Sequence, residues 1–216
     1  FSLCYLAVRN SHFGQVDTLL VFFCSLALLA IIHYLNQPHR KSLLIASTSV
    51  GIAIGTKYPA ALLMLPLWLA ILFVHRQDKT QPLSQLGKQL AIGTGVTILA
   101  FIITSPWIAL DFPTFWKDLT YEGFHYLNTD LGTGEVGWLF YPRFALYHGL
   151  GPLAFIFSLL GIGLTLKYQS KPVHWVLFSF LIGFYCLLGP NVRVFTRYCL
   201  PMLPVLILYA AWMVYT

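Results

Sequence analysis

The stretch Ser11-His12-Phe13-Gly14-Gln15-Val16-Asp17, followed at once by the largely apolar run Thr18–Leu35, decides how the chain folds. Eighteen residues at about 1.5 Å each give a helix about 27 Å long, enough to cross the core of a bilayer. Asp17 lies at the mouth of that span, where a carboxylate loses hydration. Such an acid either caps the start of the helix or lines a water-filled cavity that holds a ligand. The residues alone leave both interpretations open.

The composition of the whole chain is that of an integral membrane protein. Of 216 residues, 58% are hydrophobic and 9% are charged, whereas soluble domains carry about 25% charged residues. Lipid obliges the backbone to satisfy its own hydrogen bonds, and no run alternates as a barrel strand would, so we predict an all-α polytopic bundle. About seven spans are expected: Thr18–Leu35, Ser42–Thr56, Pro59–Val74, Gln89–Leu110, Gly149–Tyr168, Pro172–Gly189 and Leu200–Thr216.

The chain both starts and stops inside an apolar segment. We therefore expect one transmembrane region over residues 1–216, truncated at both ends and inactive when isolated as a fragment. Two of the expected spans, 42–56 and 59–74, would make a helix roughly 50 Å long if joined, which is too long for a bilayer. The sequence Gly55-Thr56-Lys57-Tyr58-Pro59 between them predicts a broken helix. Broken membrane helices commonly line binding sites, which makes Lys57 a candidate ligand-binding residue.

The charges sort onto two sides of the predicted bundle. One side is almost purely basic, which predicts that it is cytoplasmic. The other side carries six of the seven acids and the polar segment Asp111–His148, which we expect to be an external loop. That side also carries six basic residues, which either bind an anion or pair with local acids: Arg9, Lys57, Lys117, Arg143, Arg193 and Arg197.

The same distribution argues against two other classes of protein. The net charge of +6 comes from residues that punctuate the gaps between spans, as membrane topology requires, so nucleic acid is not an expected partner. The four cysteines include no CxxC pair, so the sequence predicts neither a disulfide framework nor a zinc site.

Asp17, Lys57 and Arg197 all fall where an expected span meets the outer side, so they could converge on one cavity. Arginine and lysine suit the phosphate of a lipid-linked ligand, although both also extend routinely towards lipid headgroups. In the outer segment, Glu122 and His125 are three residues apart, so they share a face if the segment is helical. There they could transfer a proton or, together with Asp17, bind a divalent ion. A solvated surface is the alternative, as it is for Asp130, Glu135 and His148 in the same segment.

Several motifs, taken in order, resemble those of a known family. The turn Ser11–Asp17 resembles one in the polytopic glycosyltransferases of the dolichyl-phosphate-mannose–protein mannosyltransferase type, glycosyltransferase family 39, which include the bacterial aminoarabinose lipid A transferase. The stretch Gly51-Ile-Ala-Ile-Gly-Thr-Lys57-Tyr58 looks like the Gly-Leu-Ala-x-Gly-x-Lys-Tyr stretch of that family. Later landmarks are also similar: Ser105-Pro106-Trp107, the loop with Glu122 and His125, and Arg197-Tyr198-Cys199-Leu200-Pro201-Met202-Leu203-Pro204.

The resemblance implies a GT-C fold and transfer of a sugar from a polyisoprenyl-phosphate donor to a lipid, glycan or protein acceptor on the non-cytoplasmic face. It implies no redox cofactor, leaves a divalent ion as an option, and places the family's principal catalytic aspartate before the region of Phe1. Asp17, Glu122 and His125 are then the catalytic candidates in this chain. The candidates for substrate binding are His12, Lys57, Tyr58, Arg193, Arg197 and Tyr198.

Two other functions remain open from the sequence. A secondary transporter or flippase for an anionic lipid-linked sugar would also use broken helices and charges within the membrane. A non-catalytic membrane subunit that keeps the fold is the second alternative. The gathering of acids and arginines at one side favours chemistry at a membrane surface, and the short loops favour a bacterial inner membrane with the site on its periplasmic face. Membrane lipids are expected partners in every case.

Overall fold

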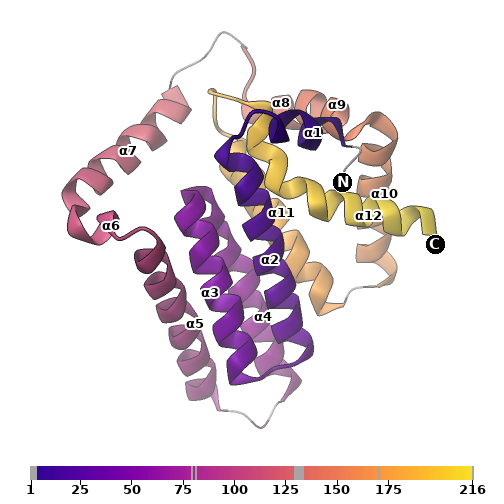
Figure 1. The fold of residues 1–216 in the computed structure, drawn as a ribbon. Coiled ribbons are helices and arrows are strands. Elements are labelled where there is room, and N and C mark those ends of the chain that lie inside the picture. Colours follow the sequence, from indigo (N-terminus) through magenta and orange to yellow (C-terminus); the bar gives the residue numbers. More distant parts are fainter. Residues whose placement is uncertain (1–3, 79, 81, 129–133, 170, 216) are drawn as a thin grey trace. The chain divides into compact units, whose positions relative to one another are not determined.

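The structure is a computed structural model that describes residues 4–78, 80, 82–128, 134–169 and 171–215. Within these ranges the chain is helical and contains no strand, so the predicted all-α fold is confirmed (Figure 1). The elements are α1 (Tyr5–Ser11), α2 (Val16–Asn36), α3 (Arg40–Thr56), the 3₁₀ helix η1 (Tyr58–Leu63), α4 (Met64–Gln77), α5 (Leu83–Thr104), α6 (Trp107–Leu110), α7 (Phe112–Asn128), α8 (Gly137–Phe140), the π-helix η2 (Tyr141–Leu146), α9 (Tyr147–Leu150), α10 (Pro152–Tyr168), α11 (Pro172–Leu188), the 3₁₀ helix η3 (Thr196–Met202) and α12 (Leu203–Tyr215).

Four helices of the described chain are long and apolar enough to cross a membrane: Val16–Asn36, Tyr58–Gln77, Leu83–Thr104 and Thr196–Tyr215. A fifth span is formed if Gly137–Leu150 and Pro152–Tyr168, bent by 114° at their junction, are taken as one. The expected number of about seven is therefore not reached by this criterion. Helices do form at the remaining two segments, but α3 and α11 have 17 residues each, which is short for a span.

The described residues divide into two compact units. Unit 1 contains those within 1–21, 107–169 and 181–216, and unit 2 contains those within 22–106 and 170–180. Asp17 and Arg197 belong to unit 1, whereas Lys57 belongs to unit 2.

In unit 2, α3 packs directly against α5 (Figure 1). A Cβ added at Gly51 would lie 2.5 Å from the carbonyl oxygen of Thr97 and 2.6 Å from the Cβ of Ala100. One turn later, a Cβ at Gly55 would meet the side chain of Thr104. The Thr97 hydroxyl also donates to the carbonyl of Ser47 at 3.1 Å. Small residues four apart thus let the two backbones approach closely, as at other membrane helix interfaces.

The predicted break between the second and third expected spans is confirmed. Helix α3 ends at Thr56, and Lys57 has extended backbone angles (φ −161°, ψ 130°) before η1 starts at Tyr58. Pro59 stands in the first turn of η1, where its missing N–H costs no helical hydrogen bond. The side chain of Lys57 is half-buried at this interruption.

The boundaries expected for the next span, Gln89–Leu110, were wrong at both ends. Helix α5 begins at Leu83, directly after the extended residue Pro82, and the polar residues before Gln89 extend the helix beyond the apolar run. It ends at Thr104 because the backbone of Ser105, which precedes Pro106, is kept out of the helical region.

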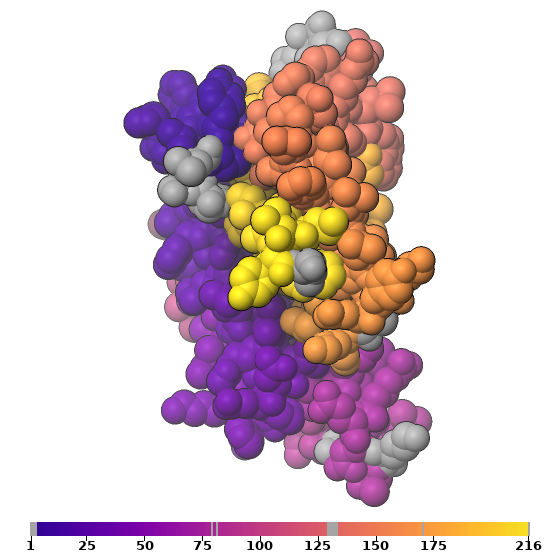
Figure 2. Space-filling model, turned by 90° about the vertical axis from the view of Figure 1, so that its right-hand side faces the viewer, coloured from indigo at the N-terminus to yellow at the C-terminus, as the bar shows by residue number. Residues whose placement is uncertain are grey.

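In unit 1, most of the segment predicted as an external loop (111–148) is helical, with α7, α8, η2 and part of α9 in its described residues. Asp130 lies outside the described residues. Helix α10 packs so closely on α12 that a Cβ at Gly161 would meet the carbonyl oxygen of Tyr209. Figure 2 shows α12, in yellow, at the surface beside the orange segment that contains α10.

Candidate functional site

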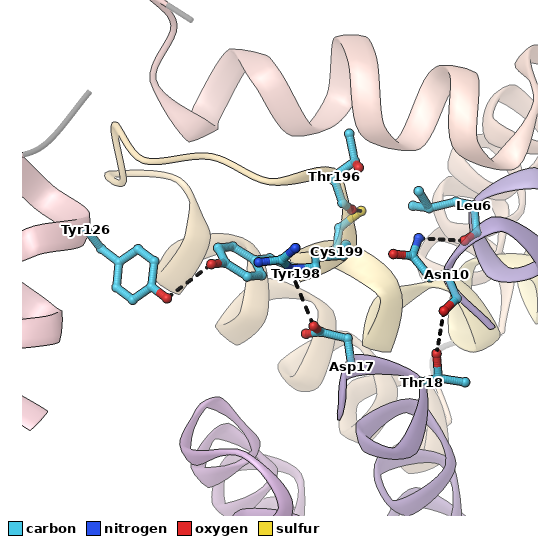
Figure 3. A network of polar contacts seen from close by, with 9 residues as sticks. Leu6, Asn10, Asp17, Thr18, Tyr126, Thr196, Tyr198 and Cys199 are labelled. Carbon is cyan, nitrogen blue, oxygen red and sulfur yellow. Dashed lines mark hydrogen bonds and ion pairs between the residues drawn. The ribbon is translucent and has the colours of Figure 1, made fainter. Parts of the chain in front are cut away.

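Asp17 and Arg197 form an ion pair in unit 1 (Figure 3). Asp17 stands in the first turn of α2 and is only 3% exposed. Its Oδ2 lies 3.6 Å from Nε of Arg197, whose side chain is 33% exposed. The carboxylate thus faces the positive end of the α2 dipole and a guanidinium together. The structure places Asp17 at the start of a helix, as the first interpretation expected, and it also pairs the carboxylate with a specific basic partner.

The turn before α2 positions this carboxylate. Gly14 has a φ of +58°, a left-handed conformation that favours glycine and reverses the chain between α1 and α2. The Asn10 amide donates to the carbonyl of Leu6 at 2.8 Å, and the Thr18 hydroxyl donates to the carbonyl of Asn10 at 3.4 Å (Figure 3). The motif Ser11–Asp17 is therefore a tight helix–turn–helix connection that ends on the acid.

Around Arg197, two cations and three rings gather into what we call the arginine–aromatic cluster: Tyr126, Arg193, Phe195, Arg197 and Tyr198. The guanidinium carbon of Arg197 lies 4.5 Å from the ring centre of Phe195 and 5.5 Å from that of Tyr198. That of Arg193 lies 5.9 Å from the ring centres of both Phe195 and Tyr126. Ring faces attract such cations and hold them in fixed orientations.

Helix α7 contributes to the cluster through Tyr126 near its C-terminal end. The Tyr126 carbonyl accepts the backbone N–H groups of Val192 (3.1 Å) and Arg193 (3.2 Å). Its hydroxyl lies 3.1 Å from that of Tyr198, and the two rings meet edge to face with centres 5.8 Å apart (Figure 3). Backbone and side chain of one residue thus fasten the segment that carries both arginines.

The cluster with Asp17 has one formal negative charge and two positive charges. In addition, Nε of Arg193 is buried and has no hydrogen-bond partner among the described residues. A buried donor left unsatisfied costs about 1–3 kcal/mol. The net charge and this spare donor favour binding of an anion.

The cluster does not include the other predicted site residues. His12 is exposed in the turn after α1. Lys57 and Tyr58 belong to unit 2, where the Tyr58 ring meets Phe101 edge to face at 6.2 Å. Their convergence with Asp17 and Arg197 stays a prediction.

Glu122 and His125 both lie on helix α7, where the sequence had indicated a loop. Glu122 is exposed, and the His125 ring stacks on Tyr121 with centres 5.6 Å apart. No three His, Cys, Asp or Glu side chains come together as a potential metal site in the described part of the chain. Asp17, Glu122 and His125 are therefore not gathered around a common ion.

Sequence reasoning missed Tyr126 and Phe195 as members of a site. The alternation Arg193-x-Phe195-x-Arg197 is a usable signal, because a ring that stands between two cations in a short segment favours cation–π contacts. No local signal marks Tyr126, which is 72 residues from its partner Tyr198. An open groove of about 490 Å³ elsewhere in unit 1 is lined by residues between Trp138 and Phe155 and includes none of the cluster residues.

We expect Tyr126→Phe to loosen the cluster without unfolding the chain. Phenylalanine keeps the ring but removes the hydroxyl contact, which is worth about 0.5–1.5 kcal/mol. Thermal unfolding in detergent should show that loss. Tyr121→Phe, at an exposed position of the same helix, is the matched control and should have no effect. If Tyr126→Phe and Tyr198→Phe lower stability additively instead of sharing one loss, the two hydroxyls do not interact.

The family model described as dolichyl-phosphate-mannose-protein mannosyltransferase matches residues 1–110. That is just over half of the 216 residues, and the chain belongs to this family of GT-C membrane glycosyltransferases. No curated protein and no solved structure matches the chain.

Membership of this family decides between the functions that the sequence left open. A membrane glycosyltransferase, with a lipid-linked sugar donor and an acceptor, is favoured over a transporter or a non-catalytic subunit. The matched residues include the turn that ends at Asp17 and the stretch that ends at Lys57 and Tyr58.

Proposed function

We propose that the protein transfers a sugar from a polyisoprenyl-phosphate donor to a hydroxyl group of a lipid, glycan or protein acceptor, and that the arginine–aromatic cluster binds the donor phosphate. The observation that carries the proposal is the meeting of two arginines and a buried aspartate where two candidate spans begin. Asp17 is the second residue of the span Val16–Asn36, and Arg197 is the second residue of Thr196–Tyr215. Lipid phosphates lie at that level of a membrane.

The charge of the site suits this ligand. A phosphodiester carries one negative charge, which would neutralise the one excess positive charge of Asp17, Arg193 and Arg197. Arginine presents paired donors that match phosphate oxygens. Arg193 also has a buried Nε for which the described part of the chain supplies no acceptor.

In the proposed reaction an acceptor hydroxyl attacks the anomeric carbon of the sugar. The bond between that carbon and the phosphate oxygen breaks, and its electron pair leaves with the polyisoprenyl phosphate. Arg193 and Arg197 stabilise the charge that builds on this leaving group. Asp17 holds Arg197 in place, since the two side chains are paired.

The hydroxyl proton must pass to a base. We propose Glu122 or His125 as this base, because both lie on α7 within the turn that leads to Tyr126. Lys57, half-buried at the break in unit 2, is proposed as a further ligand of the donor, together with Tyr58. His12 is proposed as a residue at the entrance for the acceptor. None of these roles requires a redox cofactor; a divalent ion stays an option.

The charge pattern supports the side of the membrane that we propose for the site. The segments that carry the cluster also carry most of the acids, and the opposite loops are basic, which supports a non-cytoplasmic active site. We propose a bacterial inner membrane with the site on its periplasmic face.

The test uses the protein in vesicles with a radiolabelled polyisoprenyl-phosphate sugar. Wild type should move the label to a new product, and Asp17→Asn and Lys57→Ala should each reduce that transfer strongly. Lys41→Ala, which changes an exposed lysine in the first turn of α3, is the matched control and should be neutral. Label that crosses the membrane still attached to its lipid would contradict transferase activity. Full transfer by both variants would remove these two residues from the site.

A further inference from the structure

Tyr141 is a buried tyrosine to which the proposed reaction gives no role. Its side chain is 0% exposed, and it is the first residue of the π-helix η2. Short π-helical turns within α-helical segments are frequent at functional sites. Because a buried tyrosine hydroxyl usually has a hydrogen-bond partner, the surroundings of this hydroxyl decide what the residue does.

The residue after Tyr141 explains why the α-helical pattern is interrupted here. Pro142 has no N–H with which to bond the carbonyl of Trp138, four residues earlier. That carbonyl accepts the Tyr185 hydroxyl instead, at 2.7 Å. The N–H of Trp138 in turn donates to the carbonyl of Gly189 at 2.9 Å. The segment that carries Tyr141 is therefore fastened to the part of the chain that leads into the arginine–aromatic cluster.

The hydroxyl of Tyr141 lies within the arginine–aromatic cluster. The π-helix η2 packs against η3, and the hydroxyl lies beside the backbone N–H of Phe195. Its other polar neighbours are Tyr126, Tyr198 and Cys199. The approach to Phe195 favours a hydrogen bond but does not have the geometry of a fully formed one, and the hydroxyl has no other partner among the described residues.

The N–H of Phe195 needs an acceptor, and the hydroxyl needs a use. This N–H donates to no backbone carbonyl of the described chain. A phenylalanine at position 141 would fill the same space, and it would avoid the cost of burying a hydroxyl without a hydrogen bond. Packing alone therefore favours phenylalanine over Tyr141, and the neighbour that the hydroxyl oxygen can serve is the N–H of Phe195.

Phe195 contacts both arginines of the proposed phosphate site. The centre of its ring lies 4.5 Å from the guanidinium carbon of Arg197 and 5.9 Å from that of Arg193. The carbonyl of Tyr126 already accepts the N–H groups of residues 192 and 193. A hydrogen bond from the Phe195 N–H to Tyr141 fixes the same segment two residues further along.

We infer that Tyr141 is a positioning residue of this site: its hydroxyl oxygen accepts the backbone N–H of Phe195 and so fixes the ring that orients Arg193 and Arg197. Because Tyr141 is fully buried, it acts through Phe195 and not by contact with the ligand. The link to phosphate rests on the proposed function, whereas the hydrogen bond itself does not.

The first experiment observes the Phe195 amide with no ligand present. Valine labelled with ¹³C at its carbonyl, combined with ¹⁵N-phenylalanine, selects phenylalanines that follow a valine, and in this sequence these are Phe22 and Phe195. Tyr141→Phe keeps the ring and removes the hydroxyl, so we expect the Phe195 amide to exchange with deuterium several-fold faster. Phe22, within α2, is the internal reference. Tyr147→Phe, which removes an exposed hydroxyl from α9, is the matched control and should change neither amide.

Exchange of the Phe195 amide at the wild-type rate in Tyr141→Phe would overturn the inference, because the hydroxyl would then not hold this N–H. Faster exchange of both amides would also overturn it, since the variant would then loosen the whole fold. Thermal unfolding in detergent should be little changed by Tyr141→Phe, because phenylalanine fills the same space.

The second experiment measures binding of farnesyl monophosphate, a short polyisoprenyl phosphate, by calorimetry in detergent. Tyr141→Phe should weaken binding by about 2–10-fold, the range for one ordinary hydrogen bond. With Phe195→Leu already in place, the same change should have no further effect, because the ring through which Tyr141 acts is then missing. Equal weakening with and without Phe195→Leu would overturn the inference.

The two experiments also separate this inference from the proposed function. Faster amide exchange in Tyr141→Phe, together with no binding of farnesyl monophosphate by the wild type, would contradict the proposed function alone. Binding and sugar transfer by the wild type, together with unchanged amide exchange in Tyr141→Phe, would contradict this inference alone.

Discussion

Replacement of Arg197 by alanine is expected to lower sugar transfer by about 10²–10³-fold, the usual loss when a donor to developing charge is removed. The same change leaves the buried carboxylate of Asp17 without the guanidinium that lies 3.6 Å away. Arg197→Lys should recover only part of the activity, because lysine restores the charge but not the paired donors. The measurement is transfer in vesicles from a radiolabelled donor.

Two controls separate chemistry from folding in this experiment. Arg143, 71% exposed and paired with Glu135 at 3.4 Å, is a matched arginine whose replacement by alanine should be neutral. The double variant Asp17→Asn/Arg197→Gln removes both charges, so it should unfold at a higher temperature than Arg197→Ala and still be inactive. Activity recovered in the double variant would show that Arg197 serves only to neutralise Asp17.

Gly51→Leu is expected to have the largest effect on stability. The new side chain would meet the backbone of α5, at the Thr97 carbonyl oxygen (2.5 Å) and the Phe101 nitrogen (3.0 Å), and backbone cannot rotate away. Overpacking of a core commonly costs about 1–3 kcal/mol, and we expect a loss at or above the upper end of that range.

Thermal unfolding in detergent measures this loss. Gly95→Leu, on α5 itself, is the matched control because no atom lies within 4 Å of its added Cβ, and it should change stability little. An equally small effect at Gly51 would mean that α3 and α5 do not pack as closely as described.

Much of the fold follows from the sequence because the bilayer restricts the choices. Apolar runs of the right length can only be helices there, and Gly55 to Pro59 marks the break around Lys57 correctly. The polar segment after Leu110 was less predictable. Its charges and aromatic residues indicated a loop, whereas α7 is a helix with an amphipathic pattern that a helical-wheel test of the segment would have revealed.

The site is predictable only where local sequence carries it. Asp17 and Arg197 were both singled out by their places at span ends, and they are paired. Tyr126 was not, since its contact with Tyr198 depends on how distant segments pack, which no local pattern encodes. Lys57 lies in a different unit from Arg197, so its convergence with that residue stays a prediction.

The imbalance of two arginines against one aspartate has a consequence for turnover. In the reaction that we propose, the donor phosphodiester has one negative charge, whereas the polyisoprenyl monophosphate that remains after transfer has about 1.5 to 2 at neutral pH. If the cluster binds the donor phosphate as proposed, its one excess positive charge would attract the spent carrier more strongly than the fresh donor. Product release would then limit the rate, and accumulation of empty carrier in the membrane would inhibit the enzyme. The rate at which empty carrier is recycled would then set the rate of sugar transfer to the acceptor.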